Sequence, residues 1–473
     1  MPSVIVIGGG ISGLAAAWEL RGKAQVTVLE AGDRVGGKLR TGTLAGIPVD
    51  EGAESVMALR PEAVRLAEEV GLGDSLCDPE PAPVTFWTRG ALRPLPAGHV
   101  MGIPADPADL SGSGLLSDEG LARLAREEAI PAHPVLSDGT NGSNGTDRTD
   151  ISIAGYLAPR IGQEAVDRLV EPLLGGIYAG RTDQLSLRSA LPFLAPVAAS
   201  DESLLAALRR RREGRRTAPG PKPSVVRGIA GGTGRLPRAV AAASGARVLT
   251  SSTALSLERA AGSRWRVHAA TEYGSATLDA DAVIVALPAH AAATLLGPHS
   301  PAAEAELDAV RYAGSAVVTM AFARRWQDGP SPDLNGFLVP PVDGRTIKAA
   351  TLLSHKWAWQ REEAPSKLIL RASVGRVGEE HLLGLDDRRL VTLARTELSQ
   401  ALGPLGDLHA SKVTRWPQGL PQYEVGHANR VAAIREAVGK LPGVELCGAL
   451  YEGVGVAACV TTGRAAAQRL REE

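Results

Sequence analysis

The stretch VIVIGGGISGLAAAWEL, residues 4–20, sets the fold class of this 473-residue chain. A β-branched run is followed by a glycine turn and an alanine-rich segment, which predicts a strand, a tight turn and a helix. Gly8, Gly10 and Gly13 give the spacing G-x-G-x-x-G. The first glycine permits the turn, the second lets the backbone approach a pyrophosphate, and the third lets the helix pack on the strand. The phosphates would face the N–H groups and positive dipole end of the helix.

A second strand is predicted for residues 26–29, and it ends in Glu30. A carboxylate at this place can accept hydrogen bonds from ribose hydroxyls, and it repels a 2′-phosphate. The combination predicts a dinucleotide site. It leaves open whether a nicotinamide or a flavin nucleotide binds, or whether the glycines form a turn in some other α/β protein.

The next segment, AGDRVGGKLRT at residues 31–41, resembles the extended FAD signature of the amine oxidase and protoporphyrinogen oxidase superfamily. In that pattern a G-G-[KR] turn, here Gly36, Gly37 and Lys38, runs along the flavin side of the pyrophosphate. Dehydrogenases that use NAD have no matching requirement. The resemblance therefore implies FAD as the cofactor.

The bulk properties argue against several classes of protein. A net charge of −1 and the lack of a basic patch interleaved with aromatic residues argue against a nucleic-acid partner. The three cysteines, Cys77, Cys447 and Cys459, are scattered and show neither a disulfide framework nor metal-ligand spacing. With no signal-peptide pattern and no run of eighteen apolar residues, we expect a cytoplasmic protein with at most peripheral membrane contact.

The pattern along the chain predicts an α/β fold with an FAD-binding Rossmann-like domain, a mixed-sheet substrate domain and a small helical domain. Strand, turn and helix patterns recur at both ends and in the middle of the chain. The expected FAD-binding domain is therefore discontinuous, over residues 1–60, 222–290 and 430–473. The expected substrate-binding domain covers residues 61–90 and 291–429, and the helical domain covers residues 91–221.

Two polar segments are predicted to be flexible. Residues 137–150 contain no apolar side chain and read as a mobile surface loop. Residues 208–223 carry a run of arginines that begins at Arg209 and is typical of a solvated linker. A weak contact with anionic lipid or a partner protein is the alternative for this run.

Four further blocks resemble the porphyrinogen oxidases, and within them most closely the water-soluble Gram-positive coproporphyrinogen III oxidase group. The blocks keep the family order, and the likeness spans essentially the whole chain. They are HVMGIPAD at 99–106, EPLLGGIYAGRTDQLSLRSALP at 171–192, VTRWPQGLPQYEVGH at 413–427 and LCGALYEGVGVAACVTTGR at 446–464. The resemblance implies an oxidase of haem biosynthesis that converts coproporphyrinogen III to coproporphyrin III in three two-electron oxidations, with oxygen as acceptor. The porphyrinogen is thus the expected substrate, and ferrochelatase or other haem-pathway enzymes are candidate partners.

Carried over residue by residue, the resemblance implies cofactor contacts in the glycine turns, the flavin loop and the C-terminal turn. The residues are Gly8, Gly10, Ser12, Gly13, Glu30, Gly37, Lys38, Gly52, Ala53, Glu54, Ser55, Ala254, Trp416, Gly448, Val454, Gly455 and Val456. Glu54 departs from eukaryotic relatives, which carry an arginine in the flavin loop. No cysteine or histidine stands in the C-terminal turn between Cys447 and Cys459, so FAD is expected to be non-covalent.

The chemistry needs no nucleophile, metal or dedicated base, so no catalytic side chain is expected and flavin N5 accepts the hydride. A porphyrinogen carries activated methylene hydrogens, and its pyrroles delocalise the cation that hydride loss creates. The pocket has to hold each such carbon in a narrow apolar slot. By resemblance, Gly336, Phe337, Leu338 and Ile177 line this slot, with Phe337 and Leu338 sandwiching the ring.

Cations at the rim are needed for the substrate's propionates. Arg60 is the first candidate, because it follows the flavin loop and precedes a predicted helix. Arg345 and Lys348 are weaker candidates near the Phe337 segment.

Four other functions remain open. The first alternative to a coproporphyrinogen oxidase is a protoporphyrinogen IX oxidase. A flavin amine oxidase would be expected to frame its flavin with two aromatic rings, for which the 4% aromatic content and the sequence GVGVAACV offer no pair. A carotenoid desaturase needs a long apolar tunnel, which fits poorly with the arginine-rich middle of the chain. A non-catalytic FAD scaffold or electron-transfer protein would not need the slot around Phe337.

Overall fold

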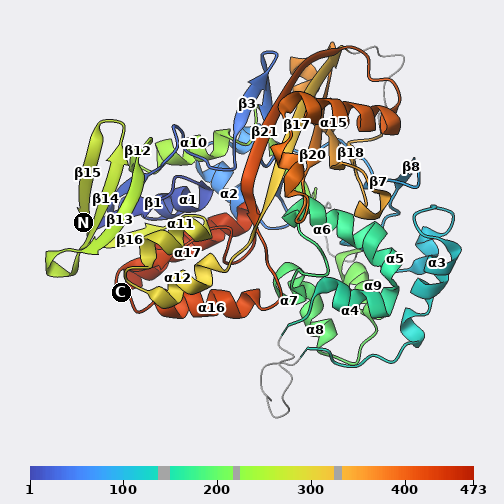
Figure 1. Ribbon diagram of the computed structural model, residues 1–473, viewed down its shortest axis with the longest axis horizontal. Helices are drawn as coiled ribbons and strands as arrows, with labels where there is room; N and C mark the ends of the chain where they lie inside the picture. Colours follow the sequence, from blue (N-terminus) through green and yellow to red (C-terminus); the bar gives the residue numbers. More distant parts are fainter. Residues whose placement is uncertain (137–149, 217–223, 324–332, 473) are drawn as a thin grey trace.

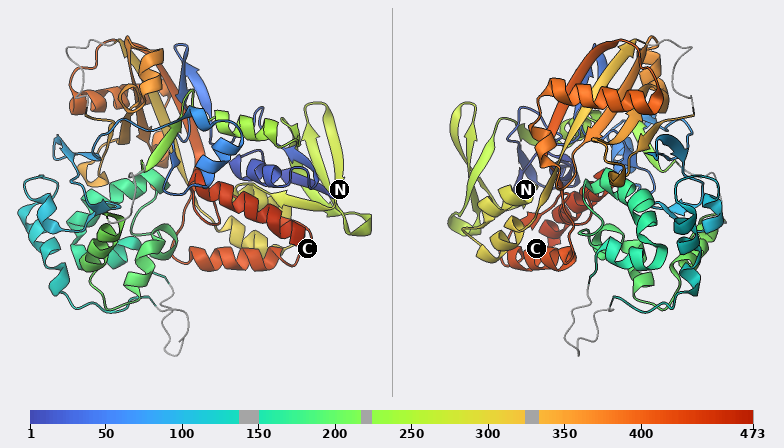
Figure 2. Two further views of the ribbon diagram at one scale, coloured as in Figure 1. Left: turned by 180° about the vertical axis from the view of Figure 1, so that it is seen from behind. Right: turned by 45° about the vertical axis from the view of Figure 1, so that its right-hand side comes forward.

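The computed structural model describes residues 1–136, 150–216, 224–323 and 333–472. A parallel sheet with its helices lies on the left of Figure 1, a large mixed sheet at the upper right, and a group of helices at the lower right. Figure 2 shows the same three parts from behind and from the side. The predicted α/β class, with a Rossmann-like part, a mixed sheet and a helical part, is confirmed.

The left-hand part is built on a five-stranded parallel sheet with β1 at its centre. The strand order is β12 (Arg247–Leu249), β2 (Gln25–Leu29), β1 (Ser3–Ile7), β16 (Ala282–Val285) and β22 (Val444–Leu446). Successive side chains of β1 enter two different cores, with Val4 and Val6 in one and Ile5 and Ile7 in the other. This alternation explains the continuous apolar run, because the strand is buried on both faces.

Both faces of the parallel sheet are covered. One is covered by α1 (Ile11–Glu19), α2 (Glu62–Glu69), α10 (Arg235–Ala243) and α17 (Val456–Glu472). The other is covered by α11 (Ala289–Leu296), α12 (Pro301–Asp308), α16 (His427–Val438) and an antiparallel sheet of β13 (Thr253–Arg259), β14 (Trp265–Thr271) and β15 (Gly274–Ala280). The helices α1 and α17 pack closely, because a Cβ on Gly463 would lie only 2.1 Å from the carbonyl oxygen of Ser12. The last helix is thereby held against the first glycine turn.

The second sheet has seven strands. Their order is β21 (Leu408–Pro421), β17 (Tyr312–Ala323), β20 (Lys367–Val374), β19 (Ile347–Leu352), β18 (Gly336–Leu338), β7 (Thr85–Thr88) and β8 (Ala91–Pro94). Only the pair of β18 and β7 is parallel in this sheet, with Leu338 opposite Phe86. The helix α15 (Asp387–Leu402) packs on one face through Leu390, Ala394 and Leu398.

The helical part lies below this sheet in Figure 1. It consists of α3 (Asp118–Ala125), α4 (Ile153–Ile161), α5 (Gln163–Ala165), α6 (Glu171–Tyr178), α7 (Leu187–Ala190), α8 (Ala195–Ala198) and α9 (Leu204–Arg216). The helix α6 packs against β18 and β19, on the side of the large sheet that α15 does not cover. Its C-terminal end therefore lies between the large sheet and the rest of the helices.

The parts begin and end at different residues from those expected. Ala63, Leu66 and Leu76 were assigned to the substrate domain, yet they pack in the core shared with α1 and α17. The reason is that α2 carries its apolar side chains on one stripe, which faces α17. The helices α11 and α12 likewise pack on the parallel sheet. The strand β8 joins the large sheet, although residues from 91 onward were expected to be helical.

The expectation of a linker over residues 208–223 is wrong for its first part, which continues α9 to Arg216. Leu204, Leu205 and Leu208 are buried and hold this helix against the helical core. Three of its arginines form ion pairs: Arg209 with Glu128, Arg210 with Glu202, and Arg212 with Asp109. Residues 217–223, and 137–149 of the expected mobile loop, lie outside the described residues.

Candidate functional site

The glycine turn after β1 forms a tight backbone cradle. A Cβ on Gly8 would lie 2.4 Å from the carbonyl oxygen of Ala286, and one on Gly13 would lie 2.1 Å from that of Gly8. Gly8 also has a φ of +113°, which side chains disfavour. A Cβ on Gly10, in contrast, meets nothing within 4 Å. Gly8 and Gly13 thus allow the turn, and Gly10 leaves its backbone open to a ligand, as the motif predicts.

Glu30 reaches back to this turn. One carboxylate oxygen accepts a hydrogen bond from the N–H of Gly9 at 2.8 Å, and the other accepts one from the N–H of Gly32 at 2.8 Å. The backbone carbonyl of Glu30 accepts from Ser252 N at 2.8 Å, which places the start of β13, with Ala254, next to this residue. The carboxylate is thus held in one orientation, with lone pairs left for ribose hydroxyls.

The second pair of glycines lies against the first turn. Gly36 N donates to the carbonyl of Gly9 at 2.7 Å, and a Cβ on Gly37 would lie 3.6 Å from the Cα of Gly10. Lys38 comes next, and burial lowers its pKa. Its carbonyl accepts from Ala53 N at 3.3 Å. The chain therefore runs from the glycine turn directly to residues 52–55.

Residues 52–55, the expected flavin loop, are held by side chains from three distant segments. Arg371 Nη2 donates to the carbonyl of Gly52 at 2.5 Å, and Thr233 Oγ1 donates to the carbonyl of Ala53 at 2.6 Å. Trp416 Nε1 donates to the carbonyl of the preceding residue, Glu51, at 2.8 Å. Trp416 therefore stands beside the loop, where the resemblance expects it.

Glu54 lies in a largely buried group of charged side chains. Its carboxylate forms ion pairs with Lys356 and, at 3.4 Å, with Arg371, and all three side chains are less than a fifth exposed. Burial by itself raises the pKa of Glu54, but the two cations outweigh it and lower the pKa below its usual value. The carboxylate comes from the loop. The two cations come from β20, which carries Arg371, and from the short helix α13 (Leu353–Lys356), which carries Lys356.

Asp50 fixes the start of this loop. Its carboxylate accepts from Thr41 Oγ1 at 2.6 Å and from Thr233 N at 3.0 Å. Burial raises the pKa of Asp50 to about 6, and the hydrogen bonds from Thr41 and Thr233 limit that rise. Asp50 and Thr233 thus join the flavin loop to the segment before α10.

The C-terminal turn, residues 448–456, completes the cradle. A Cβ on Gly448 or on Gly455 would meet nothing within 4 Å, as at Gly10. The helix α17 begins at Val456 and runs beside α1, as Figures 1 and 2 show. Two helix N-termini and Lys38, which can donate to phosphates, together with the hydrogen-bond-accepting carboxylate of Glu30, fit an elongated dinucleotide such as FAD.

We call four of the residues expected at the substrate slot and its rim the expected substrate wall: Arg60, Ile177, Gly336 and Leu338. A Cβ on Gly453 would lie 3.8 Å from Nη1 of Arg60, which is exposed. Ile177 is 36% exposed near the end of α6, and a Cβ on its neighbour Gly176 would lie 3.6 Å from Cδ2 of Leu338. Arg60 therefore lies beside the C-terminal turn, and Leu338 lies beside α6, with Gly336 on the same face of β18 as Leu338.

Phe337 does not belong to this wall. It is 2% exposed and packs in the core beneath α15, edge-on to Trp87 at 5.9 Å between ring centroids. Successive side chains of a strand point to opposite faces, so Phe337 and Leu338 cannot both face the slot. The expectation that Phe337 contacts the substrate ring is therefore wrong. That Leu338 contacts it stays a prediction.

The two weaker rim candidates are also corrected. Arg345 lies over Trp87, 4.3 Å from the ring centroid, and donates to Gln400 of α15. Lys348 is 5% exposed, and its Nζ donates to Ser315 Oγ at 3.1 Å and to the carbonyl of Gly375 at 2.7 Å. Burial lowers the pKa of Lys348 to about 7. Lys348 is therefore buried, and Arg345 lies on the side of the large sheet that α15 covers.

Sequence reasoning missed the side chains that hold the flavin loop from a distance. Lys356 and Arg371 stand 302 and 317 residues after Glu54, and nothing in their local sequence points to it. Tyr423 and His427 lie in the block that was recognised by resemblance, but no role was assigned to them. The one sequence signal that could have pointed to Arg371 is its charge within a largely apolar strand, β20.

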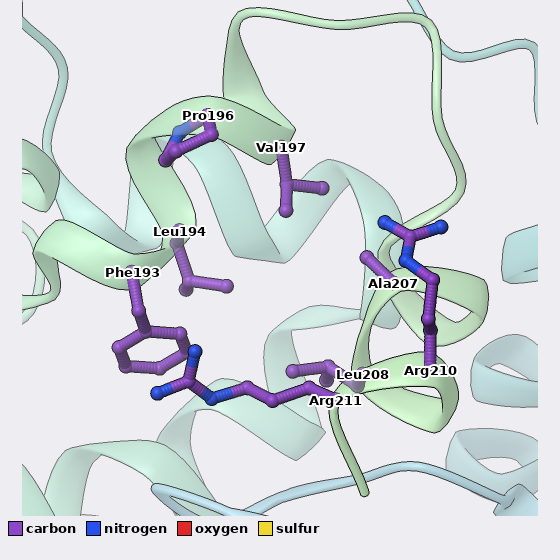
Figure 3. Close-up of a pocket in the computed structure, with 8 residues that line it drawn as sticks. All are labelled: Phe193, Leu194, Pro196, Val197, Ala207, Leu208, Arg210 and Arg211. Carbon is purple, nitrogen blue, oxygen red and sulfur yellow. The ribbon is translucent and has the colours of Figure 1, made fainter. Parts of the chain in front are cut away.

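Other kinds of site find little support in the described parts of the chain. They contain no group of three His, Cys, Asp or Glu side chains that could hold a metal ion, and no helix long and apolar enough to cross a membrane. A groove of about 320 Å³ lies between residues 193–197 and α9. Figure 3 shows Arg211 extended toward Phe193 along this groove, with its guanidinium carbon 5.0 Å from the ring centroid. None of its lining residues belongs to the cradle.

Comparison with known proteins gives concordant results. The profile of the family described as flavin containing amine oxidoreductase matches residues 11–471. The coproporphyrinogen III oxidase of Mycobacterium bovis is 34% identical and that of Bacillus subtilis 31% identical, each over 98% of this chain and 96% of the relative. A solved structure from Exiguobacterium sp. 255-15, of a protein assigned as a protoporphyrinogen oxidase, superposes with a TM-score of 0.84 at 29% identity, covering 100% of this chain and 99% of the other.

Proposed function

The chain belongs to the flavin containing amine oxidoreductase family, and from that premise we propose that it oxidises coproporphyrinogen III to coproporphyrin III. As a member of this family it is a flavin-dependent oxidoreductase. The observation that carries the substrate is the full-length similarity to relatives named coproporphyrinogen III oxidase. The position of Arg60 beside the C-terminal turn, and of Leu338 beside the helix that carries Ile177, supports it.

In this proposal the residues of the cradle hold FAD. Gly8 to Gly13 and Lys38 take the pyrophosphate, Glu30 takes the ribose nearer the adenine, and residues 52–55, Trp416 and 454–456 take the flavin ring. When bound, FAD supplies two-electron oxidation of the substrate and returns the electrons to oxygen. The N-terminus of α17 provides the positive end of a helix dipole, which favours the negative charge that develops on reduction.

The side chains of the slot bind and orient the substrate. Ile177 and Leu338 offer apolar contacts to the flat faces of the macrocycle and exclude water from them. Arg60, at the exposed edge, pairs with a propionate. Hydride loss leaves a cation that the pyrroles stabilise, and each two-electron oxidation is completed when this cation loses a proton to water, so no side chain is required as a base. Three such oxidations of one substrate molecule require that it rebind or turn in the slot.

The preference for coproporphyrinogen III over protoporphyrinogen IX is expected to depend on Arg60. The two substrates differ in carrying four propionates or two, and one charge-assisted contact in a partly wet rim contributes about 1–2 kcal/mol, roughly tenfold in kcat/KM. Arg60→Ala should therefore lower kcat/KM for coproporphyrinogen about tenfold, mainly through KM, and lower that for protoporphyrinogen less. Steady-state rates on both substrates measure this effect.

The matched control is Arg388→Ala, an exposed arginine on α15 away from the cradle, which should change neither rate. A wild-type protein that prefers protoporphyrinogen overturns the substrate assignment and favours the alternative. Equal losses on both substrates in Arg60→Ala would remove Arg60 as the propionate anchor.

We also propose that FAD is bound without a covalent link. Cys447 and Cys459 flank the C-terminal turn and are buried, and burial raises the pKa of the Cys459 thiol, which disfavours a reactive thiolate. Acid precipitation of the purified protein should release all of the flavin into the supernatant. Yellow colour that remains in the washed pellet would contradict non-covalent binding.

A further inference from the structure

Tyr423 bridges the two ends of the C-terminal turn. Its hydroxyl donates to the carbonyl of Ala449 at 2.6 Å and accepts from the N–H of Gly453 at 2.8 Å. The side chain is 2% exposed, so water does not compete for these bonds. A hydroxyl is needed at this position because the group has to donate and accept at the same time.

His427 holds the middle of the same turn. Its Nε2 lies 2.9 Å from the carbonyl oxygen of Leu450, and its ring stacks on Tyr423 with 3.9 Å between centroids and 15° between planes. Burial lowers the pKa of His427 to about 4, so the ring is neutral near pH 7. A carbonyl can only accept, so Nε2 is the protonated nitrogen of this neutral ring.

The segment that carries these two side chains is itself fixed to the helical part. Gln422 Nε2 donates to the carbonyl of Tyr178 at 2.8 Å, and Ser186 N donates to the carbonyl of Tyr423 at 2.7 Å. The ring of Tyr178 also lies against Tyr423, with 5.6 Å between the ring centroids. Tyr178 follows Ile177 at the end of α6, so the segment links the expected substrate wall to the C-terminal turn.

We propose that Tyr423 and His427 are positioning residues that hold the turn 449–453, and with it the N-terminus of α17, in the geometry that sets the flavin's reduction potential. This inference rests on the proposed placement of the flavin ring against residues 454–456. The electrostatic effect of a helix terminus falls off within about one turn, so a small displacement of the turn weakens it. The pair therefore acts on the flavin through the backbone and touches neither cofactor nor substrate.

A Tyr423→Phe variant tests the proposal, because it keeps the ring and removes both hydrogen bonds. We expect FAD to remain bound, since the Gly8 turn and Glu30 are unchanged. The equilibrium between oxidised and reduced flavin should shift about tenfold toward the oxidised form, about 30 mV for a two-electron couple. A spectroscopic redox titration of the holoprotein with a reference dye measures this shift without any substrate.

Tyr451→Phe is the matched control. Tyr451 lies in the same turn and is 6% exposed, but within the described residues its hydroxyl has no hydrogen-bond partner. This variant should have the wild-type potential. A Tyr423→Phe protein with the wild-type potential and only a lowered melting temperature would overturn the proposal and leave Tyr423 a purely structural residue.

Substitutions of His427 provide a second test should Tyr423→Phe fail to fold. His427→Gln can still donate to the carbonyl of Leu450, whereas His427→Leu cannot. The potential should fall in the leucine variant and recover, at least in part, in the glutamine variant; equal potentials in both would contradict the proposal. A chain that shows these shifts but does not oxidise porphyrinogens would refute the proposed function and leave this inference standing.

Discussion

Replacing Glu30 by arginine is expected to abolish FAD retention. In the wild-type protein this carboxylate is oriented by the N–H groups of Gly9 and Gly32 and faces the expected ribose position. Its two charge-assisted hydrogen bonds to ribose hydroxyls contribute roughly 1.5–3 kcal/mol each, so their loss weakens binding by about two to four orders of magnitude. The arginine also leaves two backbone N–H groups without their acceptor. Glu30→Ala should show the same effect more weakly.

Flavin absorbance per mole of protein after gel filtration measures this effect. Glu436→Arg is the control, since Glu436 is an exposed residue of α16 that pairs with the exposed Lys440. It should retain its full complement of flavin. Unchanged flavin occupancy in both Glu30 variants would remove this residue from the cofactor site.

Glu54→Gln is expected to cause the largest loss of stability among single substitutions in the flavin loop. The change leaves Lys356 and Arg371 without their counter-ion in a site where all three side chains are less than a fifth exposed. Removing one partner of a buried ion pair costs about 3–5 kcal/mol of unfolding free energy. The loop at Gly52 should loosen as well, because Arg371 also holds its carbonyl.

Urea unfolding of the holoprotein, monitored by circular dichroism, measures this difference. The control is Glu80→Gln, which breaks the exposed Glu80–Arg361 pair and should cost no more than about 1 kcal/mol. Because the pKa of Glu54 is lowered in the folded protein, its stabilisation is present above the usual carboxyl pKa and is lost as pH falls through the lowered value. The difference between wild type and Glu54→Gln should thus shrink in acid; equal stability of the two proteins at pH 7 would contradict this role.

Local patterns predicted the backbone geometry of the glycine turn, because the rules that govern it operate within short stretches of chain. The strand, glycine turn and helix at residues 4–20 specify a close backbone approach that the contacts of Gly8 and Gly13 reproduce. The position of Glu30 at the end of the second strand follows from the length of one βαβ unit. These features depend on backbone geometry and spacing, so one segment is sufficient to reveal them.

It was harder to predict which face of a strand or helix a side chain would lie on. Phe337 was assigned to the slot by resemblance, but the alternation of β18 turns it into the core beneath α15 and turns Leu338 to the opposite face. The arginine run from Arg209 reads as a linker by composition, yet Leu204, Leu205 and Leu208 supply the buried stripe of a helix. Compositional bias toward charge concealed this stripe.

The contacts of Glu54 could not be predicted, since its partners lie on a strand and a helix more than 300 residues away. Which face of β20 would meet the flavin loop depends on how the large sheet docks on the parallel sheet. That docking is a property of the tertiary structure, and it cannot be inferred from a local pattern in one sequence.

Anaerobic reduction of the bound flavin tests the central claim most directly. The wild-type holoprotein is mixed in parallel with coproporphyrinogen III, protoporphyrinogen IX, simple amines and phytoene, and the visible flavin absorbance is followed with time. The proposed function predicts rapid bleaching by coproporphyrinogen III, slower bleaching by protoporphyrinogen IX, and no bleaching by amines or phytoene. Bleaching by an amine or by phytoene while both porphyrinogens leave the flavin oxidised would contradict it.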